Sequence, residues 1–336
     1  MKNKLIVLIF ITALLLVELN AYGTPYTVEV LNSDKSTTTI NYKINDFRMT
    51  PVLIDSRVYY SLRLTGEGIT HNIGEPELPY ISHSIIVPDK SNTKISVVYS
   101  DFEEMTIDIV PSKGILLRDV DPDSVDYHFG DIYQEDAFSP YSLTELGDPY
   151  ILRDFRGQAV RVYPFQYNPV AGILRVYREI TVKVSSIDGA SNNIKLREYP
   201  GYQPEFESIY KSHFINFNNH YFRYRSVRGR MIIIVYDAFA EVTIPYMNWK
   251  IQKGMPVTMH RISEIGNTAA AIKTFIQEQY NNDDGLVYVQ LVGDHPQIPS
   301  FIINSGGSDP SFSLIDGEDN WLQIDAFATC LQLCLI

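Results

Sequence analysis

The chain has 336 residues, enough for two domains, and 45% of the residues are hydrophobic while 20% are charged. Its formal net charge of −12 leaves no broad basic surface to neutralise phosphates, which argues against a nucleic-acid-binding protein. The two cysteines, Cys330 and Cys334, lie at the extreme C-terminal end. This placement excludes a disulfide framework in the body of the chain and a structural zinc site built on thiolates.

The first 23 residues have the pattern of a secretory signal peptide. Lys2 and Lys4 precede an apolar stretch at 5–17, and Ala21 and Gly23 supply the small residues that a signal peptidase recognises. The apolar stretch is roughly 13 residues long, against the ~20 that a membrane-spanning helix needs. We therefore expect cleavage after Gly23 and an exported protein, secreted or at the cell surface, with no membrane span.

Residues 24–185 show the pattern of an all-β domain. Short runs rich in Val, Ile, Tyr and Thr recur between turn signals, and several alternate between apolar and polar residues, as strands with one solvated face do. The expected strands cover residues 26–31, 37–44, 58–64, 85–87, 95–99, 105–110, 159–163 and 173–184. No helical periodicity interrupts them, so we predict a β-sandwich of antiparallel sheets.

Residues 186–230 are expected to form a linker. The segment opens with a polar, turn-rich stretch and ends with four arginines within eight residues. The simplest interpretation is a solvated loop. The alternative is an activation segment that an arginine-directed protease cuts at Arg225, Arg228 or Arg230.

From residue 231 onward the pattern is that of an α/β domain. The expected elements alternate strand, helix, strand, helix, strand over residues 231–236, 244–253, 256–262, 268–280 and 286–292. The last strand is apolar throughout, as in a parallel sheet covered on both faces, and Gly293, Asp294 and His295 follow it. Functional residues of such sheets follow the carboxyl ends of strands, so we expect Asp294 and His295 on the functional rim.

Several of these segments resemble gingipain-like cysteine peptidase precursors. In the β region, the Gly-x-Pro-x-x-Pro segment at 74–79 and the closing segment at 159–184 are similar to that family's propeptide. In the α/β region, the similar features are the Trp-Lys-x-x-x-Gly helix end at 249–254, the apolar strand ending in Gly-Asp, and the Gly-rich loop at 305–320.

The resemblance implies a particular domain order. After the signal peptide come a β-sandwich propeptide at 24–185 and a linker with a basic activation segment at 186–230. Residues 231–320 then correspond to the N-terminal part of a caspase-like, doubly wound α/β peptidase domain, which is incomplete. Residues 321–336 depart from the family pattern, and we expect them to form an aberrant tail of a truncated chain.

The resemblance also implies an activity and partners. The propeptide would assist folding and block the cleft of its own or a related peptidase domain until cleavage in the basic segment. The full-length enzyme would be a thiol endopeptidase that acts on protein substrates through a Cys–His dyad, so the precursor would be a zymogen.

The catalytic residues themselves are not found. The resemblance implies a His followed by Gly after one strand and a Cys after the next, but none of the seven histidines precedes Gly. His295 follows an earlier strand than the family's catalytic position, so we expect a structural or rim role. Cys330 and Cys334 lie in the divergent tail and are not expected to be nucleophiles. We therefore assign no catalytic residue and expect this chain to be inactive.

Asp309, Asp316 and Asp319 lie in the Gly-rich loop and are candidate calcium ligands, although a polar turn is the simpler interpretation. No other cofactor is expected.

Two further classes of protein stay open. One is a non-enzymatic secreted β-sandwich that acts as an inhibitor or interaction module. The other, a nucleotide-binding α/β protein, is disfavoured because no Gly-rich loop follows the strand at 231–236.

Overall fold

The computed structural model describes residues 24–196, 201–219, 229–282, 285–303, 306–315 and 327–331. The chain divides into two compact units. The first contains residues 24–83, 94–147 and 159–185, and the second contains 84–93, 148–158 and the described residues from 186 onward. Two short segments of the expected β domain therefore belong with the C-terminal part of the chain, which a division at residue 185 does not anticipate.

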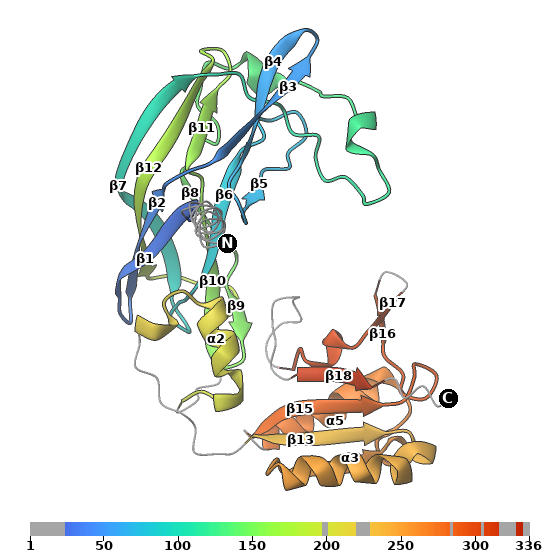
Figure 1. Ribbon diagram of the computed structural model, residues 1–336. Coiled ribbons are helices and arrows are strands. Elements are labelled where there is room, and N and C mark those ends of the chain that lie inside the picture. The colour runs from blue at the N-terminus through green and yellow to red at the C-terminus, as the bar shows by residue number, and fades with distance from the viewer. Residues whose placement is uncertain are drawn as a thin grey trace, which may run out of the picture. The chain divides into compact units, whose positions relative to one another are not determined.

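Two five-stranded sheets and a hairpin make up the β region (Figure 1). One sheet has the order β1 (Tyr26–Ser33), β2 (Thr37–Ile44), β12 (Ile173–Ile187), β11 (Phe165–Asn168), with β7 (Asn92–Thr106) also paired to β12. The other has the order β5 (Gly68–Ile69), β6 (Pro79–Ile86), β10 (Phe155–Val162), β8 (Thr144–Leu146), with β9 (Tyr150–Leu152) also paired to β10. The hairpin is β3 (Arg48–Ile54) and β4 (Arg57–Arg63). Two short 3-10 turns, η1 (Pro122–Ser124) and η2 (Asp131–Gln134), lie between β7 and β8.

Alternation of side chains explains why these sheets face each other. In β2, Ile40 and Tyr42 are almost fully buried, and each lies opposite a buried residue of β12 in antiparallel register. The Tyr42 ring lies 6.0 Å from the ring of His83, which belongs to β6 of the other sheet. The predicted sandwich of antiparallel sheets is confirmed.

The α/β region contains a four-stranded parallel sheet in the order β14 (Val257–Arg261), β13 (Arg230–Val235), β15 (Leu286–Val292), β18 (Phe327–Leu331) (Figure 1). The helices are α3 (Ala240–Gln252), which follows the 3-10 turn η5 (Asp237–Phe239), and α4 (Ile262–Ile265) and α5 (Ala269–Asn282). A hairpin of β16 (Phe301–Ile303) and β17 (Gly306–Ser308) precedes the turn η6 (Pro310–Phe312). The predicted strand–helix alternation is confirmed, and β18 adds a fourth strand where we expected an aberrant tail.

Burial of β13 on both faces explains its unbroken apolar sequence. Ile232 and Ile234 belong to one buried cluster with Ile272 and Ile276 of α5, whereas Ile233 belongs to a second cluster with residues of α3. Alternate side chains of the strand thus point to opposite faces, and each face carries a helix. The sheet is therefore covered on both sides, as the sequence predicts.

Helix α5 begins where the sequence predicts, whereas helix α3 begins earlier. Thr268 caps α5, because its Oγ1 accepts a hydrogen bond of 3.1 Å from the backbone N–H of Ala271. Helix α3 begins at Ala240, four residues earlier than we predicted, so Pro245 lies inside the helix rather than in its first turn. The ring removes one backbone donor there, which the helix tolerates at the cost of one hydrogen bond.

The expected linker is in part a folded segment. It contains the 3-10 turn η3 (Pro204–Phe206), helix α2 (Glu207–His213) and the turn η4 (Phe217–Asn219). Its aromatic side chains pack with Tyr150, Leu152 and Phe155 of the β9–β10 hairpin and with Val287 of β15; they are Tyr202, Phe206, Tyr210, Phe214 and Phe217. We call this group the aromatic cluster. Four of its members recur every four residues, which is the spacing of one helix face, and this signal contradicts a solvated loop.

The aromatic cluster encloses polar groups as well. Asp154, in the turn between β9 and β10, accepts hydrogen bonds from the backbone N–H of Gln203 (2.9 Å) and the hydroxyl of Tyr210 (2.8 Å). In a second polar contact, the Tyr150 hydroxyl lies 2.6 Å from Nε2 of His213. Burial raises the pKa of Tyr150 to about 12 and lowers the pKa of His213, so the tyrosine donates to a neutral imidazole.

Arg156 is a fully buried cation held by neutral acceptors. Its guanidinium donates to the carbonyl oxygens of Pro88 (2.8 Å), Ser91 (2.9 Å), Asn192 (2.7 Å) and Asn193 (2.8 Å), and to the Ser191 hydroxyl (2.5 Å). These acceptors come from two segments of the second unit, and Arg156 itself comes from a third. The side chain therefore ties the three segments together.

Replacing Arg156 by leucine should lower the free energy of unfolding by about 3–5 kcal/mol, because four carbonyl groups lose a charged donor at once and the link between the three segments is removed. Urea denaturation followed by fluorescence measures this difference. Arg161→Leu is the matched control, since Arg161 lies on the same strand in an exposed pair with Glu145 and should change stability by less than about 1 kcal/mol. Equal effects of the two substitutions would contradict the clamping role of Arg156.

The depressed pKa of His213 gives stability a defined pH dependence. The unfolded chain binds this proton at a higher pH than the folded chain does, so the free energy of unfolding should fall as the pH drops from about 7 to about 5. His213→Gln should flatten that slope in denaturation curves. Part of the slope should survive, because burial also lowers the pKa of His83. An unchanged slope in His213→Gln would refute the assignment.

Candidate functional site

The carboxyl edge of the parallel sheet gathers the polar side chains of the α/β region. Strands β13, β14 and β15 are mutually parallel, so their carboxyl ends meet at one edge (Figure 1). Asp237 follows β13, Arg261 closes β14, and Asp294 and His295 follow β15. Asp294 and His295 thus follow the carboxyl end of β15, and a functional role for this rim stays a prediction.

A tight turn after β15 depends on Gly293. This residue has φ +152°, and a Cβ there would lie 2.7 Å from Cγ1 of Ile298, which is buried in the α5-side cluster. The turn is closed by two backbone hydrogen bonds to the Asp294 carbonyl, from Gln297 (2.8 Å) and Ile298 (2.9 Å). A residue without a side chain is needed because the backbone approaches the core so closely. The turn presents Asp294 and His295 to solvent.

His295 is tied to its own loop. Its Nδ1 accepts a hydrogen bond from the backbone N–H of Ser300 (3.3 Å) and lies 3.2 Å from the Ser300 hydroxyl. An accepting Nδ1 puts the proton of a neutral imidazole on Nε2. Within the described residues, these contacts of His295 join the two ends of its own loop.

A second polar group on the same edge joins β13 to β14. Asp237 accepts hydrogen bonds from the backbone N–H of Ser263 (3.2 Å) and from its hydroxyl, and Arg261 donates to the Asp237 carbonyl (3.1 Å) and reaches Glu241 (3.4 Å). The Ser263 hydroxyl is the main reason that the pKa of Asp237 is lowered, and the charge of Arg261 adds to it. The group fixes loop geometry at the rim and keeps a carboxylate ionised there. Sequence reasoning did not identify it, because its members lie up to 26 residues apart.

The candidate processing residues have different positions. Gly23, Arg225 and Arg228 lie outside the described residues. Arg230 is the first residue of β13: its backbone N–H donates to the Gly285 carbonyl (2.7 Å), and its guanidinium donates to the Gln279 carbonyl (3.0 Å) in the last turn of α5. A cation is favoured at that end of a helix. Arg230 is thus built into the folded strand.

The candidate metal ligands are not brought together by the described structure. Asp309 precedes the turn η6 and its backbone carbonyl accepts from Phe312 (2.9 Å), whereas Asp316 and Asp319 lie outside the described residues. Across the ranges that the structure describes, no group of three or more His, Cys, Asp or Glu side chains is arranged to hold a metal ion. In the tail, the backbone of Cys330 pairs with Leu291 in β15, and Cys334 lies outside the described part.

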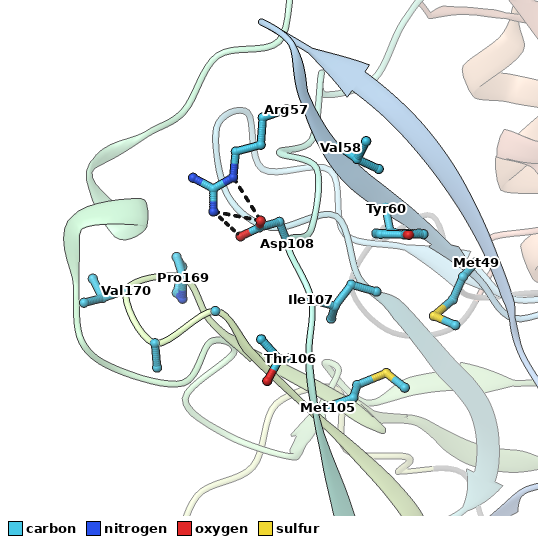
Figure 2. Close-up of a pocket in the computed structure, with 12 residues that line it drawn as sticks. Met49, Arg57, Val58, Tyr60, Met105, Thr106, Ile107, Asp108, Pro169 and Val170 are labelled. Carbon is cyan, nitrogen blue, oxygen red and sulfur yellow. Dashed lines mark hydrogen bonds and ion pairs between the residues drawn. The ribbon is translucent and has the colours of Figure 1, made fainter.

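An open cavity of about 630 Å³ lies in the β region, between the β3–β4 hairpin, residues 105–108 and the turn at 169–172. Figure 2 shows its apolar wall, formed by Met49, Val58, Met105, Ile107 and Val170, beside an ion pair. Arg57 binds Asp108 in a bidentate manner, with distances of 3.0 Å and 2.7 Å. The two charges pair with each other, and the cavity presents polar and apolar surface in similar measure. Its residues come from three separate segments, which is why no sequence motif marks it.

No helix within the described ranges is both long enough and apolar enough to cross a membrane.

Comparison with known families agrees with this architecture. Residues 19–225 match the Propeptide_C25 family, and residues 225–326 match Peptidase family C25. Gingipain R2 of Porphyromonas gingivalis is 36% identical over 310 residues, which is 88% of this chain and 41% of that protein. Lys-gingipain of the same organism is 29% identical over 76% of this chain and 16% of its own length. The chain thus spans about two fifths or less of these relatives.

A solved structure of a related protein also matches this chain. The complex of the RgpB pro- and mature domains from Porphyromonas gingivalis contains a chain that aligns with 57% of this chain and 97% of its own length, at 36% identity and a TM-score of 0.54. The two matches together define a chain in which a propeptide region precedes a peptidase region. The chain belongs to the gingipain family, C25, and comprises its propeptide and part of its peptidase region.

Proposed function

We propose that the chain is the exported precursor of a gingipain-type cysteine endopeptidase, in which the propeptide acts as folding aid and inhibitor. On this proposal residues 1–23 are a signal peptide, 24–185 form the main body of the propeptide, and 231–320 belong to the peptidase domain. The observation that carries the proposal is the alignment with almost the whole of one chain in a complex of pro- and mature domains. A chain built like a prodomain is expected to bind a mature domain.

The chemistry proposed for the mature enzyme is thiol-dependent hydrolysis of proteins. We assign no catalytic residue in this chain, because none of its seven histidines is followed by glycine, as the family's catalytic histidine would be. Asp294 and His295 are proposed as rim residues that shape the carboxyl edge. The purified chain is therefore expected to hydrolyse no peptide substrate.

We further propose that the activation cut falls at Arg225 or Arg228 and not at Arg230. The support is the hydrogen bonding of Arg230 within β13 and to α5, since a protease needs an extended and accessible segment. An arginine-directed protease should therefore release a C-terminal fragment that begins at Ser226 or Gly229, as N-terminal sequencing would show.

Variants sharpen this test. Replacing both Arg225 and Arg228 by glutamine should abolish the cut. Arg230→Gln should leave the cut in place and lower the free energy of unfolding by about 1–2 kcal/mol, because a carbonyl loses a charged donor. A fragment beginning at Met231 would show that Arg230 is the processing residue after all.

The inhibitor role has a direct test. Residues 24–228, added to the mature domain of Gingipain R2, should inhibit its hydrolysis of a peptide substrate with a dissociation constant on the order of 10⁻⁷ M or lower, as for a specific interface of standard size. Activity is measured against inhibitor concentration, with heat-unfolded fragment as control. Absence of binding to any gingipain-type mature domain would favour the alternative, a secreted β-sandwich interaction module.

A further inference from the structure

Glu205 has an incompletely satisfied carboxylate inside the second unit. It lies in the turn η3, between the exposed Pro204 and the fully buried Phe206 of the aromatic cluster. Its Oε2 atom is buried and accepts no hydrogen bond in the described structure. A buried carboxylate oxygen without a donor is destabilising, so a cation or a donor placed beside it would stabilise the carboxylate.

The other oxygen of this carboxylate lies against the backbone of Gly229. A Cβ added to Gly229 would overlap with Oε1 of Glu205 and would lie 2.6 Å from its Cδ and 2.9 Å from Cγ2 of Val287. Since Cβ and the amide nitrogen are both bonded to the same Cα, the carboxylate lies within about 5 Å of that nitrogen. Gly229 is itself buried and directly precedes β13.

Cutting the bond before Gly229 would change the chemistry at this nitrogen. In the intact chain it is an amide with one hydrogen and no charge. After the cut it becomes an α-amino group, which is protonated at neutral pH and has three hydrogens to donate. The new charge would therefore arise beside a carboxylate whose Oε2 atom accepts no hydrogen bond in the described structure.

We propose that Glu205 is a binding site for the α-ammonium group of Gly229, which is created when the chain is cut after Arg228. This inference rests on the proposed activation cut. Glu205 lies on the propeptide side of the cut and Gly229 on the peptidase side, so cleavage creates an ion pair between the two fragments. This ion pair adds to the contacts that hold the two fragments together after the cut. Release of the propeptide therefore requires a second event.

The surroundings of Glu205 and Gly229 favour an ion pair that is stronger than one exposed on the surface. Val287, which touches the same glycine, is fully buried and belongs to the aromatic cluster. Tyr288 is the neighbouring titratable group, and both burial and the charge of Glu205 raise its pKa, so it stays neutral and does not compete for the ammonium. A charge pair in partly desolvated surroundings is stronger than an exposed one.

The test uses the full chain with a cut at a defined bond. Residues 223–228 are replaced by the protease recognition sequence Glu-Asn-Leu-Tyr-Phe-Gln, so that cleavage leaves Gly229 as the new N-terminus. Dissociation of the two fragments is followed by native mass spectrometry and by size-exclusion chromatography, and thermal unfolding is recorded before and after the cut. The variants are Glu205→Gln and, as a matched control, Glu207→Gln, which removes an equal charge from a partly exposed i, i+4 pair with Lys211.

We expect opposite effects of Glu205→Gln in the two forms. Before the cut, the substitution should leave the unfolding temperature unchanged or raise it, because a buried charge without a donor is removed. After the cut, it should speed dissociation of the fragments at least about tenfold, because the ammonium loses its partner. Glu207→Gln should have no effect in either form.

A displaced ammonium provides a second, independent variant. Inserting Gly-Ser between the recognition sequence and Gly229 moves the new N-terminus by up to about 7 Å without changing any charge. This form should dissociate as fast as cut Glu205→Gln. Equal dissociation rates for the cut parent, Glu205→Gln and the displaced form would overturn the proposal, as would fragments of the cut parent that separate at once. Natural processing at another bond would refute the proposed cut alone, since the engineered form tests Glu205 independently.

Discussion

One buried guanidinium holds together segments that are distant in sequence. Arg156 satisfies its donors with carbonyl oxygens and a hydroxyl, and no carboxylate is among the acceptors described for it. Such a charge is stable only while all the acceptors stay in place, because a buried cation that loses them is strongly destabilising. The geometry of residues 84–93, 148–158 and 186–195 is therefore mutually dependent. The turn with Asp154 and the aromatic cluster are positioned by the same frame.

The hydrogen bonds of Arg156 explain why the boundaries of the two compact units differ from a division of the chain into consecutive domains. Strand β10 begins in the second unit and ends in the first, so a single strand serves both. The segment at 201–219 joins the second unit because its aromatic side chains pack on the β9–β10 hairpin and on Val287. A cut in the basic segment separates the chain at a covalent bond, but the buried contacts of this unit span that bond.

Sequence reasoning succeeded where a period repeats over many residues. The alternation in β2 and β12, and the unbroken apolar runs of β13 and β15, are strong signals because burial on one face or on both dictates them. Short strands such as β5 and β8 have too few residues for any period to show. Helix α2 was missed because it is short and the aromatic residues in it and on either side of it are common in strands, so that only their spacing of four indicates a helix face.

The candidate site was predictable in part for the same reason. Gly293, Asp294 and His295 follow a strand whose type the sequence makes plain, whereas Asp237 and Ser263 meet only through the pairing of two strands. The cavity beside Arg57 and Asp108, and the contact of Glu205 with Gly229, depend on tertiary packing and have no sequence signature. The hydrogen bonds of Arg156 have no sequence signature either, because most of its partners are backbone carbonyl oxygens, which every residue carries.

The place where β15 meets the aromatic cluster has an evolutionary consequence. Val287 is the second residue of that strand, so this contact is made at its amino end, whereas the rim loops follow its carboxyl end. Substitutions that diversify the rim need not disturb the surface on which the strand is seated. The rim loops can therefore change in sequence while the same hairpin and helix continue to pack against the amino end of β15.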